Sequence, residues 1–537
     1  MTKHQNSSKW ISNSLSRRDV LRAGGLLLPA TLIAPTLFTR VSHAAASGTF
    51  NYYISTNGND SNPGTLALPW AITGINTHQA AYAGKRVGIL PGVYDVSRLM
   101  ANANYQGAVL QINGGPNSST PTYIGTCNAS GAYEPGTATL DSYGSVGQYG
   151  GGSSSAPYVI GVTSHGGNCG PQPPNLGNWT LDGLIISGFA NWAITLCDDG
   201  GEPAQIPNVV IQNCTLTNSV CGLTTTHPGP IMLYRCKNVL VSNCWLYNNK
   251  NTAADGTHYA GILIFGISGP TTGVVIEKCS LVNSSCIYVA EDNFAVDNIT
   301  VRQCYFDMTA AGQNFHQSNA MMGFSKTGAG LIANSIHHNI VKGGYLYDCY
   351  PTNQTSNGMS CYNNTLDLAG GSPGVGMRFQ EASGSTGIFS CYNNLFYDNG
   401  ATGVGYGYNV CNVDGFSVCD YNIYGMLNKF GAYGANGSTS GPNPQTFASW
   451  KSATGRDAHS STNSANPFTK NGVDALQYQV QSGSPAYKTG HIGGLSSGAV
   501  CNVGAWDSTV TQIGYSAGAA SSGSVAEPNP PVLTVVS

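Results

Sequence analysis

The stretch that decides the fold runs from Asn208 to Asn218 and reads NVVIQNCTLTN. It places apolar residues three positions before and two positions after a central residue, here Cys214. The pattern recurs as VLVSNCWLYN, VVIEKCSLVN, ITVRQCYFDM, NSIHHNIVKG, MSCYNNTLDL and FSCYNNLFYD, with looser copies in WTLDGLIIS and FSVCDYNIY. The central residues are Leu184, Cys214, Cys244, Cys279, Cys304, Asn339, Asn364, Asn394 and Asn422. They follow one another at intervals of 25 to 35 residues, a period typical of solenoids.

Two columns of apolar side chains flank the central residues. The first comprises Leu181, Ile211, Val241, Ile276, Val301, Ile336, Cys361, Cys391 and Cys419, and the second Ile186, Leu216, Leu246, Leu281, Phe306, Val341, Leu366, Phe396 and Tyr424. Each copy is too short for a helix and is bounded by Asn and Gly, so we expect a β-strand. One strand stacked per turn in the same direction predicts a parallel β-solenoid, in which each coil buries its apolar face against its neighbours.

A second apolar segment accompanies most copies. These segments are residues 193–197, 222–226, 261–265, 286–290, 320–324, 345–349, 375–379 and 404–408. Every coil should therefore carry at least two strands. The loops between them are long at 248–260 and 307–319, and insertions of this kind tend to build a binding face.

The first 46 residues carry the features of an export signal. The run SRRDVLR, from Ser16 to Arg22, is a twin-arginine motif, and an apolar run and small residues suited to a signal peptidase follow it. Pro29 and Pro35 interrupt the apolar run, which is shorter than the roughly 20 residues that span a membrane. We therefore predict export by the twin-arginine machinery to the periplasm or the extracellular space, with no membrane span in the mature chain.

The composition excludes some partners. Six of the 22 basic residues and one of the 25 acidic residues fall in the signal, so the rest has 16 basic and 24 acidic residues and a formal net charge of −8. A nucleic-acid-binding protein needs a basic surface, so nucleic acid is not expected as a partner. Only 9% of residues are charged, while Gly numbers 70, as in turn-rich all-β chains.

Sixteen cysteines in an exported chain would ordinarily suggest disulfides. Several of them, however, occupy the apolar columns, where a thiol acts as a small core residue. Cysteines of neighbouring coils, such as Cys214 and Cys244, would also lie close enough for a disulfide. The interpretation as core thiols is favoured, and the absence of C-x-x-C spacing argues against zinc.

Both ends of the chain resemble a known family. The N-terminal segment reads YYISTNGNDSNPGT from Tyr52 to Thr65 and VGILPGVY from Val87 to Tyr94, and the distal end carries GSPAYKTG from Gly483 and VGAW from Val503. These segments resemble those of secreted right-handed parallel β-helix proteins, including polysaccharide lyases of the pectate, alginate and chondroitin type. The resemblance implies an all-β, right-handed parallel β-helix of about nine or more coils with long loops on one side. The preference of parallel crossovers gives the same hand.

The predicted organisation follows from these segments. Residues 1–46 form the signal, 47–100 an N-terminal segment and cap, 101–430 the coils, 431–510 C-terminal loops and a closing segment, and 511–537 a disordered tail. We expect a monomer.

Charged residues at or just beyond the second segments would be brought into line by successive coils. They are Asp198, Asp199, Glu202, His227, Glu291, Asp292, Lys326, Asp348, Arg378 and Glu381. The candidates for contacting substrate beside this line are His258, Tyr259, Tyr406 and Tyr408. A trough with carboxylates, a few cations and aromatic faces suits an extended polysaccharide.

A lyase interpretation gives these residues roles. Elimination from a uronate needs its carboxylate neutralised, and Ca²⁺ held by Asp198, Asp199, Glu291 and Asp292 would do this. Lys326 or His316 would take the proton, and Arg378 would stabilise the developing negative charge.

Other interpretations stay open. The acidic pairs also read as ordinary turns, Lys326 and Arg378 also suit surface ion pairs, and His337 and His338 lie inside a copy and are interpreted as structural. A polygalacturonase-like glycoside hydrolase would use a pair of carboxylates. A non-catalytic glycan-binding or surface protein would show aromatics and Asn without a coupled acid, base and metal.

Overall fold

The computed structural model describes most of the chain after the predicted signal. The described residues are 48–100, 108–142, 158–163, 173–189, 191–197, 205–219, 229–249, 260–267, 269–284, 286–291, 293–309, 319–325, 331–351, 357–368, 375–379, 389–397, 406–410, 416–425, 429–433, 446–463, 465–469, 474–494, 496–507 and 509–516. All of them belong to one compact unit, Arg40–Ser537. The predicted signal, residues 1–46, lies outside them.

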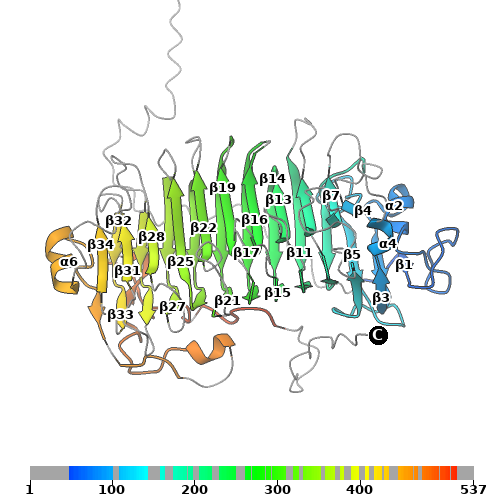
Figure 1. Ribbon diagram of the computed structural model, residues 1–537. Helices are drawn as coiled ribbons and strands as arrows, with labels where there is room; N and C mark the ends of the chain where they lie inside the picture. The colour runs from blue at the N-terminus through cyan, green and yellow to red at the C-terminus, as the bar shows by residue number, and fades with distance from the viewer. Residues whose placement is uncertain are drawn as a thin grey trace, which may run out of the picture. The chain divides into compact units, whose positions relative to one another are not determined.

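Three parallel sheets form the body of this unit, and successive coils add one strand to each sheet in turn (Figure 1). In the described residues the first sheet consists of β1 (Tyr52–Ile54), β2 (Arg86–Ile89), β5 (Thr122–Thr126), β8 (Trp179–Asp182), β11 (Ile206–Gln212), β14 (Cys236–Ser242), β17 (Thr271–Glu277), β20 (Val296–Arg302), β23 (Leu331–His337), β26 (Asn357–Tyr362), β29 (Phe389–Tyr392) and β32 (Phe416–Asp420).

The second sheet follows the first after a tight bend. As far as the chain is described, it consists of β3 (Gly92–Asp95), β6 (Ala138–Asp141), β9 (Ile185–Ser187), β12 (Thr215–Thr217), β15 (Trp245–Tyr247), β18 (Ser280–Val282), β21 (Tyr305–Asp307), β24 (Ile340–Lys342), β27 (Thr365–Asp367), β30 (Leu395–Tyr397), β33 (Ile423–Gly425) and β35 (Ser461–Thr462).

The third sheet completes each coil. Its described strands are β4 (Ala108–Gln111), β7 (Tyr158–Thr163), β10 (Trp192–Cys197), β13 (Gly229–Tyr234), β16 (Ile262–Gly266), β19 (Ile287–Glu291), β22 (Asn319–Ser325), β25 (Tyr345–Pro351), β28 (Val375–Phe379), β31 (Tyr406–Val410) and β34 (Lys429–Tyr433).

The arrangement confirms the predicted fold class. Neighbouring strands of all three sheets pair in parallel, and parallel crossovers of this kind are right-handed in nearly all proteins. The chain is an all-β, right-handed parallel β-helix. The prediction of nine or more coils is also confirmed, because the first sheet has 12 strands within the described residues.

The register confirms both predicted apolar columns. Leu181, Ile211 and Val241 are direct partners in the first sheet, and Ile186, Leu216 and Leu246 are partners in the second. Every side chain of the two columns is at most 5% exposed. Alternate residues of a strand face opposite sides of a sheet, so the inward half of each strand forms one continuous core.

The bend between the first and second sheets takes two residues per coil. In the central copy these are Asn213 and Cys214, and Asn213 has φ 54°. Asn tolerates this left-handed conformation because its short side chain bonds locally. The corresponding residues with positive φ are Gly183, Asn213, Asn243, Lys278, Gln303, His338, Asn363, Asn393 and Tyr421.

The residue after each of these bends faces the interior. Cys214, Cys244, Cys279 and Cys304 are fully buried, and the Sγ of Cys214 donates to the carbonyl of Gln212 at 3.2 Å. The column cysteines lie in the core as predicted, and none of the described cysteines forms a disulfide.

Asparagines continue this column as a hydrogen-bonded ladder. The Nδ2 of Asn339, Asn364 and Asn394 donates to the Oδ1 of the next member at 3.1, 3.0 and 3.2 Å. The last member, Asn422, donates to the Oδ1 of buried Asp457 at 3.1 Å.

The predicted second segments are strands of the third sheet, with one correction. Ile194, Ile231 and Ile262 are partners in β10, β13 and β16. The strand of the middle coil is therefore Gly229–Tyr234, whereas residues 222–226, which were predicted for it, lie outside the described residues. The prediction of at least two strands per coil is confirmed. There are three, because the tight bend joins two short strands that the sequence pattern presents as one.

The ends of the β-helix carry short elements. The N-terminal side has α2 (Gly74–Thr77), α3 (Gln79–Tyr82) and α4 (Ser97–Met100), and the distal side has α6 (Phe447–Thr454), the 3-10 helices η5 (Asp474–Tyr478) and η6 (Ile492–Gly494), and the antiparallel pair β36 (Gly490–His491) and β37 (Val500–Cys501). In the described part of the chain, no helix is long and apolar enough to cross a membrane.

The C-terminal segment runs back over the outer face of the second sheet, and we call its described residues between 486 and 516 the strap (Figure 1). Gly504 N donates to Asn393 O, Gly514 N to Gln303 O, and Ser516 N to Asn243 Oδ1, each at 2.8 Å. Residues 511–516, assigned from the sequence to a tail, therefore belong to the strap, and residues 517–537 lie outside the described residues.

Candidate functional site

Most of the predicted site residues cannot be placed. Asp198, Asp199, His258, Tyr259, Asp292, His316 and Lys326 lie outside the described residues. The backbone of Arg378 in β28 pairs with Asp348 of β25 and with Asn409 of β31. Tyr406 and Tyr408 of β31 pair with Val375 and Met377 of β28. The roles given to these residues stay predictions.

Glu291 is the predicted metal ligand that the structure describes. It is the last residue of β19, it is 0% exposed, and it pairs with Gly266 and Ser325 of the adjacent coils. Among the residues that the structure places, no group of three or more His, Cys, Asp or Glu side chains could hold a metal ion.

The outer face of the third sheet carries an apolar cluster in its middle coils. Met232, Leu263 and Tyr288 alternate with the core residues of their strands and form a separate buried cluster with Trp192 and Cys286. A line of carboxylates and cations was expected near this face. Apart from Glu291, the side chains of that line are not among the described ones, so the expectation stays a prediction.

The outer face of the first sheet carries the polar side chains. From β8 onward the last residue of each strand faces outward, and successive coils stack these residues in direct register as Asp182, Gln212, Ser242, Glu277, Arg302, His337, Tyr362, Tyr392 and Asp420. We call this series the outer column.

Two histidines and one carboxylate form a hydrogen-bonded chain beside the outer column. His337 ends β23 and is partly exposed, and His338 is the left-handed residue of the following bend. Their Nδ1 atoms are 2.8 Å apart. The Nε2 of His338 lies 2.9 Å from the Oδ2 of Asp507, which the strap brings to this bend. We call these three residues the relay.

The chemistry of the partners assigns the protons in the relay. A carboxylate only accepts, so the Nε2 of His338 donates to Asp507. When His338 is neutral, its Nδ1 accepts, and the proton between the rings belongs to the Nδ1 of His337. The Nε2 of His337 then carries a lone pair and can take a proton.

The surroundings keep this base unprotonated. Burial, followed by the nearby His338 and Arg302, lowers the pKa of His337 well below 6.5, against an opposite effect of Asp507. Burial acts to raise the pKa of Asp507, but hydrogen bonds from His338 and Thr509 hold it below its usual value. Asp507 is therefore ionised at neutral pH and orients the relay.

A cation stands next to the relay on the preceding coil. Arg302 is the register partner of His337 and is held by Glu277, whose Oε2 accepts from its Nε at 2.9 Å. The Arg302 side chain remains 40% exposed. On the other side, the ring of Tyr362 stacks on His337 with centroids 4.5 Å apart and an interplanar angle of 7°.

Hydroxyl groups run parallel to the outer column. Thr300, Ser335, Ser360 and Ser390 are register partners two residues before it, and the Thr300 and Ser335 hydroxyls lie 3.2 Å apart. This face therefore combines a base that can accept a proton, a cation that can bind an anion, and hydroxyl groups.

Reasoning from the sequence missed the relay, although one signal was present. The period that gives the central residues also places Glu277, Arg302 and His337 in one column two positions earlier. The third member, Asp507, is 169 positions from His338 in the sequence. No periodic signal indicates that contact.

Comparison of the sequence with family models and with curated proteins finds no match. Among solved structures, pectate lyase Pel9A is 14% identical with a TM-score of 0.49, covering 85% of this chain and 95% of its own. A rhamnogalacturonan lyase is 17% identical with a TM-score of 0.43, covering 66% and 84%. A glycoside hydrolase is 10% identical with a TM-score of 0.40, covering 76% and 99%. These similar structures include polysaccharide lyases, the class that the sequence resembles, and the reaction must be inferred from the residues of this chain.

Proposed function

We propose that this chain is an exported, carbohydrate-active β-helix protein that cleaves a uronic-acid-containing polysaccharide by β-elimination. The observation that best supports the proposal is the relay next to Arg302 on the polar outer face of the first sheet. Elimination from a uronate needs a base for the proton beside the carboxylate and a cation for the carboxylate itself. His337 and Arg302 are side chains of these two kinds on neighbouring coils.

The proposed reaction proceeds as follows. Arg302 pairs with the sugar carboxylate, which makes the adjacent carbon–hydrogen bond more acidic. The Nε2 of His337 takes that proton, and the electrons of the broken bond form a carbon–carbon double bond. The bond between the next carbon and the glycosidic oxygen breaks, and that oxygen takes a proton from water. The products are a shortened chain and a chain that ends in an unsaturated sugar.

The relay stabilises the protonated base. Once Nε2 of His337 is protonated, its Nδ1 proton can move along the 2.8 Å hydrogen bond to His338. The positive charge then lies next to the Asp507 carboxylate instead of next to Arg302. In this mechanism His338 and Asp507 are positioning residues, and His337 is the catalytic residue.

Calcium and the loop residues remain part of the proposal. Ca²⁺ bound by Asp198, Asp199 and Asp292 would neutralise a uronate carboxylate. Glu291, whose side chain is fully buried, would be the fourth ligand of this site. The alternative is that the same reaction takes place at the loops. Lys326 or His316 would then be the base, and Arg378 would lie opposite the developing charge. The residues along the substrate would be His258, Tyr259, Tyr406 and Tyr408.

The experiment measures ultraviolet absorbance of the purified protein with pectate, alginate and chondroitin-type chains, with Ca²⁺ and with a chelator. A rising absorbance reports the unsaturated product. In the proposed mechanism, His337→Gln lowers the rate by about 10²- to 10⁴-fold, the usual contribution of a general base. The matched control is His459→Gln, a histidine on the same face whose side chain is 57% exposed and pairs with Asp420 outside the relay.

The other outcomes decide between the alternatives. Full activity in His337→Gln with loss of activity in Lys326→Ala would move the reaction to the loops. Release of reducing ends without a rise in absorbance would identify a glycoside hydrolase. Binding of a chain without either product would identify a glycan-binding protein.

A further inference from the structure

A polar groove lies at the opposite edge of the first sheet from the relay. Its volume is about 800 Å³, and its lining residues include Asn178, Gln205, Asn208, Arg235 and Lys237. Lys237 is the second residue of β14, whereas His337 is the last residue of β23. The groove therefore follows the beginnings of the first-sheet strands and the relay follows their ends.

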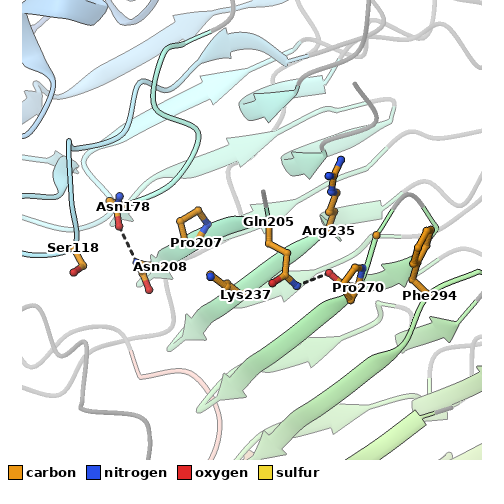
Figure 2. A pocket seen from close by; sticks show the side chains of 10 residues that line it. Ser118, Asn178, Gln205, Pro207, Asn208, Arg235, Lys237, Pro270 and Phe294 are labelled. Carbon is orange, nitrogen blue, oxygen red and sulfur yellow. Dashed lines mark hydrogen bonds between the residues drawn. The ribbon is translucent and has the colours of Figure 1, made fainter. Parts of the chain in front are cut away.

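Successive coils contribute to the groove in order, as Figure 2 shows for Asn178, Asn208 and Lys237. The lining runs from Ser118, which precedes β5, to Phe294, which precedes β20. Six neighbouring coils at about 4.8 Å each extend over roughly 24 Å along the axis. A site of this length suits several units of a linear chain better than one small molecule.

The charge of the groove is opposite to that of the molecule. None of its ten lining residues is acidic, and two of them, Arg235 and Lys237, are cations. Beyond the predicted signal the chain has 24 acidic and 16 basic residues. A cationic groove on an acidic protein gives an anionic ligand a defined place to bind.

The polar side chains of the groove are held in place. The Nδ2 of Asn208 donates to the Oδ1 of Asn178 at 2.8 Å, and the Nε2 of Gln205 donates to the carbonyl of Pro270 at 2.6 Å (Figure 2). Amide groups fixed in this way can meet the hydroxyl groups of a sugar without losing side-chain entropy on binding. Phe294, which is 42% exposed, offers an apolar surface beside them.

Arg235 precedes β14 and is 9% exposed. Its φ is 48°, and the same left-handed conformation recurs at Asn208 and Asn238, so this conformation belongs to the repeating geometry of the coils. Its side chain passes over Gly269, where an added Cβ would lie 2.8 Å from Cγ of Arg235. The sequence thus provides space for this arginine on the neighbouring coil.

We infer that this groove is a binding site for several consecutive units of a carboxylate-bearing polysaccharide, with Arg235 and Lys237 pairing with the carboxylates. The inference rests on the proposed function for the class of the chain and is independent of the reaction. A chain held here and at the relay would extend across the first sheet, so the protein would bind long chains more tightly than short ones.

The test measures the affinity of the protein for polygalacturonate and for the same polymer fully methyl-esterified, which lacks the charges. We expect binding of the charged polymer that weakens with added salt and at least tenfold weaker binding of the ester. The variants are Lys237→Gln, Gly269→Ala and the double change Arg235→Gln with Lys237→Gln. The double variant should lose about tenfold in affinity, which corresponds to about 1.4 kcal/mol. The control is Lys488→Gln, an exposed lysine on the strap.

Lys237 is exposed, so its variant keeps the test valid even if a change at Arg235 disturbs folding. Equal affinity of the double variant and the wild type, or equal affinity for the charged and esterified polymers, overturns the inference. If the wild type binds through the groove but forms no unsaturated product, the proposed function is wrong and the inference about the groove still holds. If the wild type forms the product while the groove variants bind with unchanged affinity, the inference about the groove is wrong and the proposed function still holds.

Discussion

At the scale of single residues, the two most informative groups are ionisable side chains whose charged forms are disfavoured by their surroundings. Asp457 closes the interior asparagine ladder, and His337 faces the outside of the first sheet. Each has a pKa displaced by burial first of all, Asp457 upward and His337 downward. In both cases burial disfavours the charged form, so both make the stability of the fold depend on pH.

Asp457 is predicted to be indispensable for the distal coils. Its Oδ2 accepts from Nε1 of Trp450 at 3.0 Å and from Sγ of Cys419 at 3.3 Å. Asp457→Asn replaces one carboxylate oxygen by an amide NH₂ group, which donates and cannot accept from these donors. The free energy of unfolding of the variant should therefore be lower by about 1–3 kcal/mol. Denaturant unfolding at pH 7 measures the difference. Ser460→Ala removes one hydrogen-bond donor to the carboxylate but leaves the carboxylate in place. This variant should lose less stability than Asp457→Asn.

His337 is predicted to weaken the fold in acid. Its folded pKa is below the unfolded value, so the unfolded chain binds more protons as the pH falls below about 6.5. Stability is therefore full above that pH and is lost as the pH falls toward the folded pKa. Denaturant midpoints at pH 7 and pH 5 should differ more for the wild type than for His337→Gln. An equal drop in both proteins would contradict the assignment. The pKa of Asp507 is lowered, so its protonation affects stability only near and below pH 4. It therefore does not contribute to the difference between pH 7 and pH 5.

At the scale of the elements, the repeated bend determines how much the sequence could predict. The nine copies predicted the positions of the apolar columns and the inward-facing thiols, because a period fixes which residues become neighbours. The period could not separate the two strands that the bend joins, because both belong to one continuous apolar pattern. It also misplaced one third-sheet strand, since residues 222–226 and Gly229–Tyr234 are both apolar enough and only the register chooses between them.

The four stacked thiols are predicted to be inert in the folded protein. Burial, as the largest cause, raises the pKa of Cys214, Cys244 and Cys279 well above 9.0. A thiol reagent needs a thiolate and access, so native protein should show no labelling at these positions or at Cys304 when modified peptides are identified by mass spectrometry. Unfolding in denaturant should expose all four. Cys501, which is partly exposed, serves as the internal positive control.

At the scale of the whole molecule, the contacts of the strap are the part of the structure that the sequence could not predict. Contacts between residues of one coil and the next follow the period, whereas contacts between Asp507 and His338 or between Gly504 and Asn393 join distant parts of the chain. The relay and the groove were missed for related reasons. The relay needs the strap, and the groove needs the beginnings of the first-sheet strands of six coils to be aligned in space.

Removal of the strap is predicted to destabilise the fold and disable the relay together. A chain ending at Ala499 lacks Val503, Ala505, Trp506, Val510 and Ile513, which pack on the second sheet. Its outer face would then expose Ile340 and Leu395, so we expect a lower Tm and aggregation in light-scattering measurements. A chain ending at Ser516 keeps these contacts and is the control. Equal Tm values for the two truncations would contradict this role of the strap.

The route of the strap also has a consequence for the timing of folding. Each coil needs only its predecessor as a template, so the body of the molecule can form progressively as the chain emerges from the ribosome. His338 is in place early, but its carboxylate partner is synthesised 169 residues later and must fold back past several finished coils. A chain that stops before Asp507 can therefore form coils but cannot complete the relay, so the proposed reaction depends on a residue made long after His338.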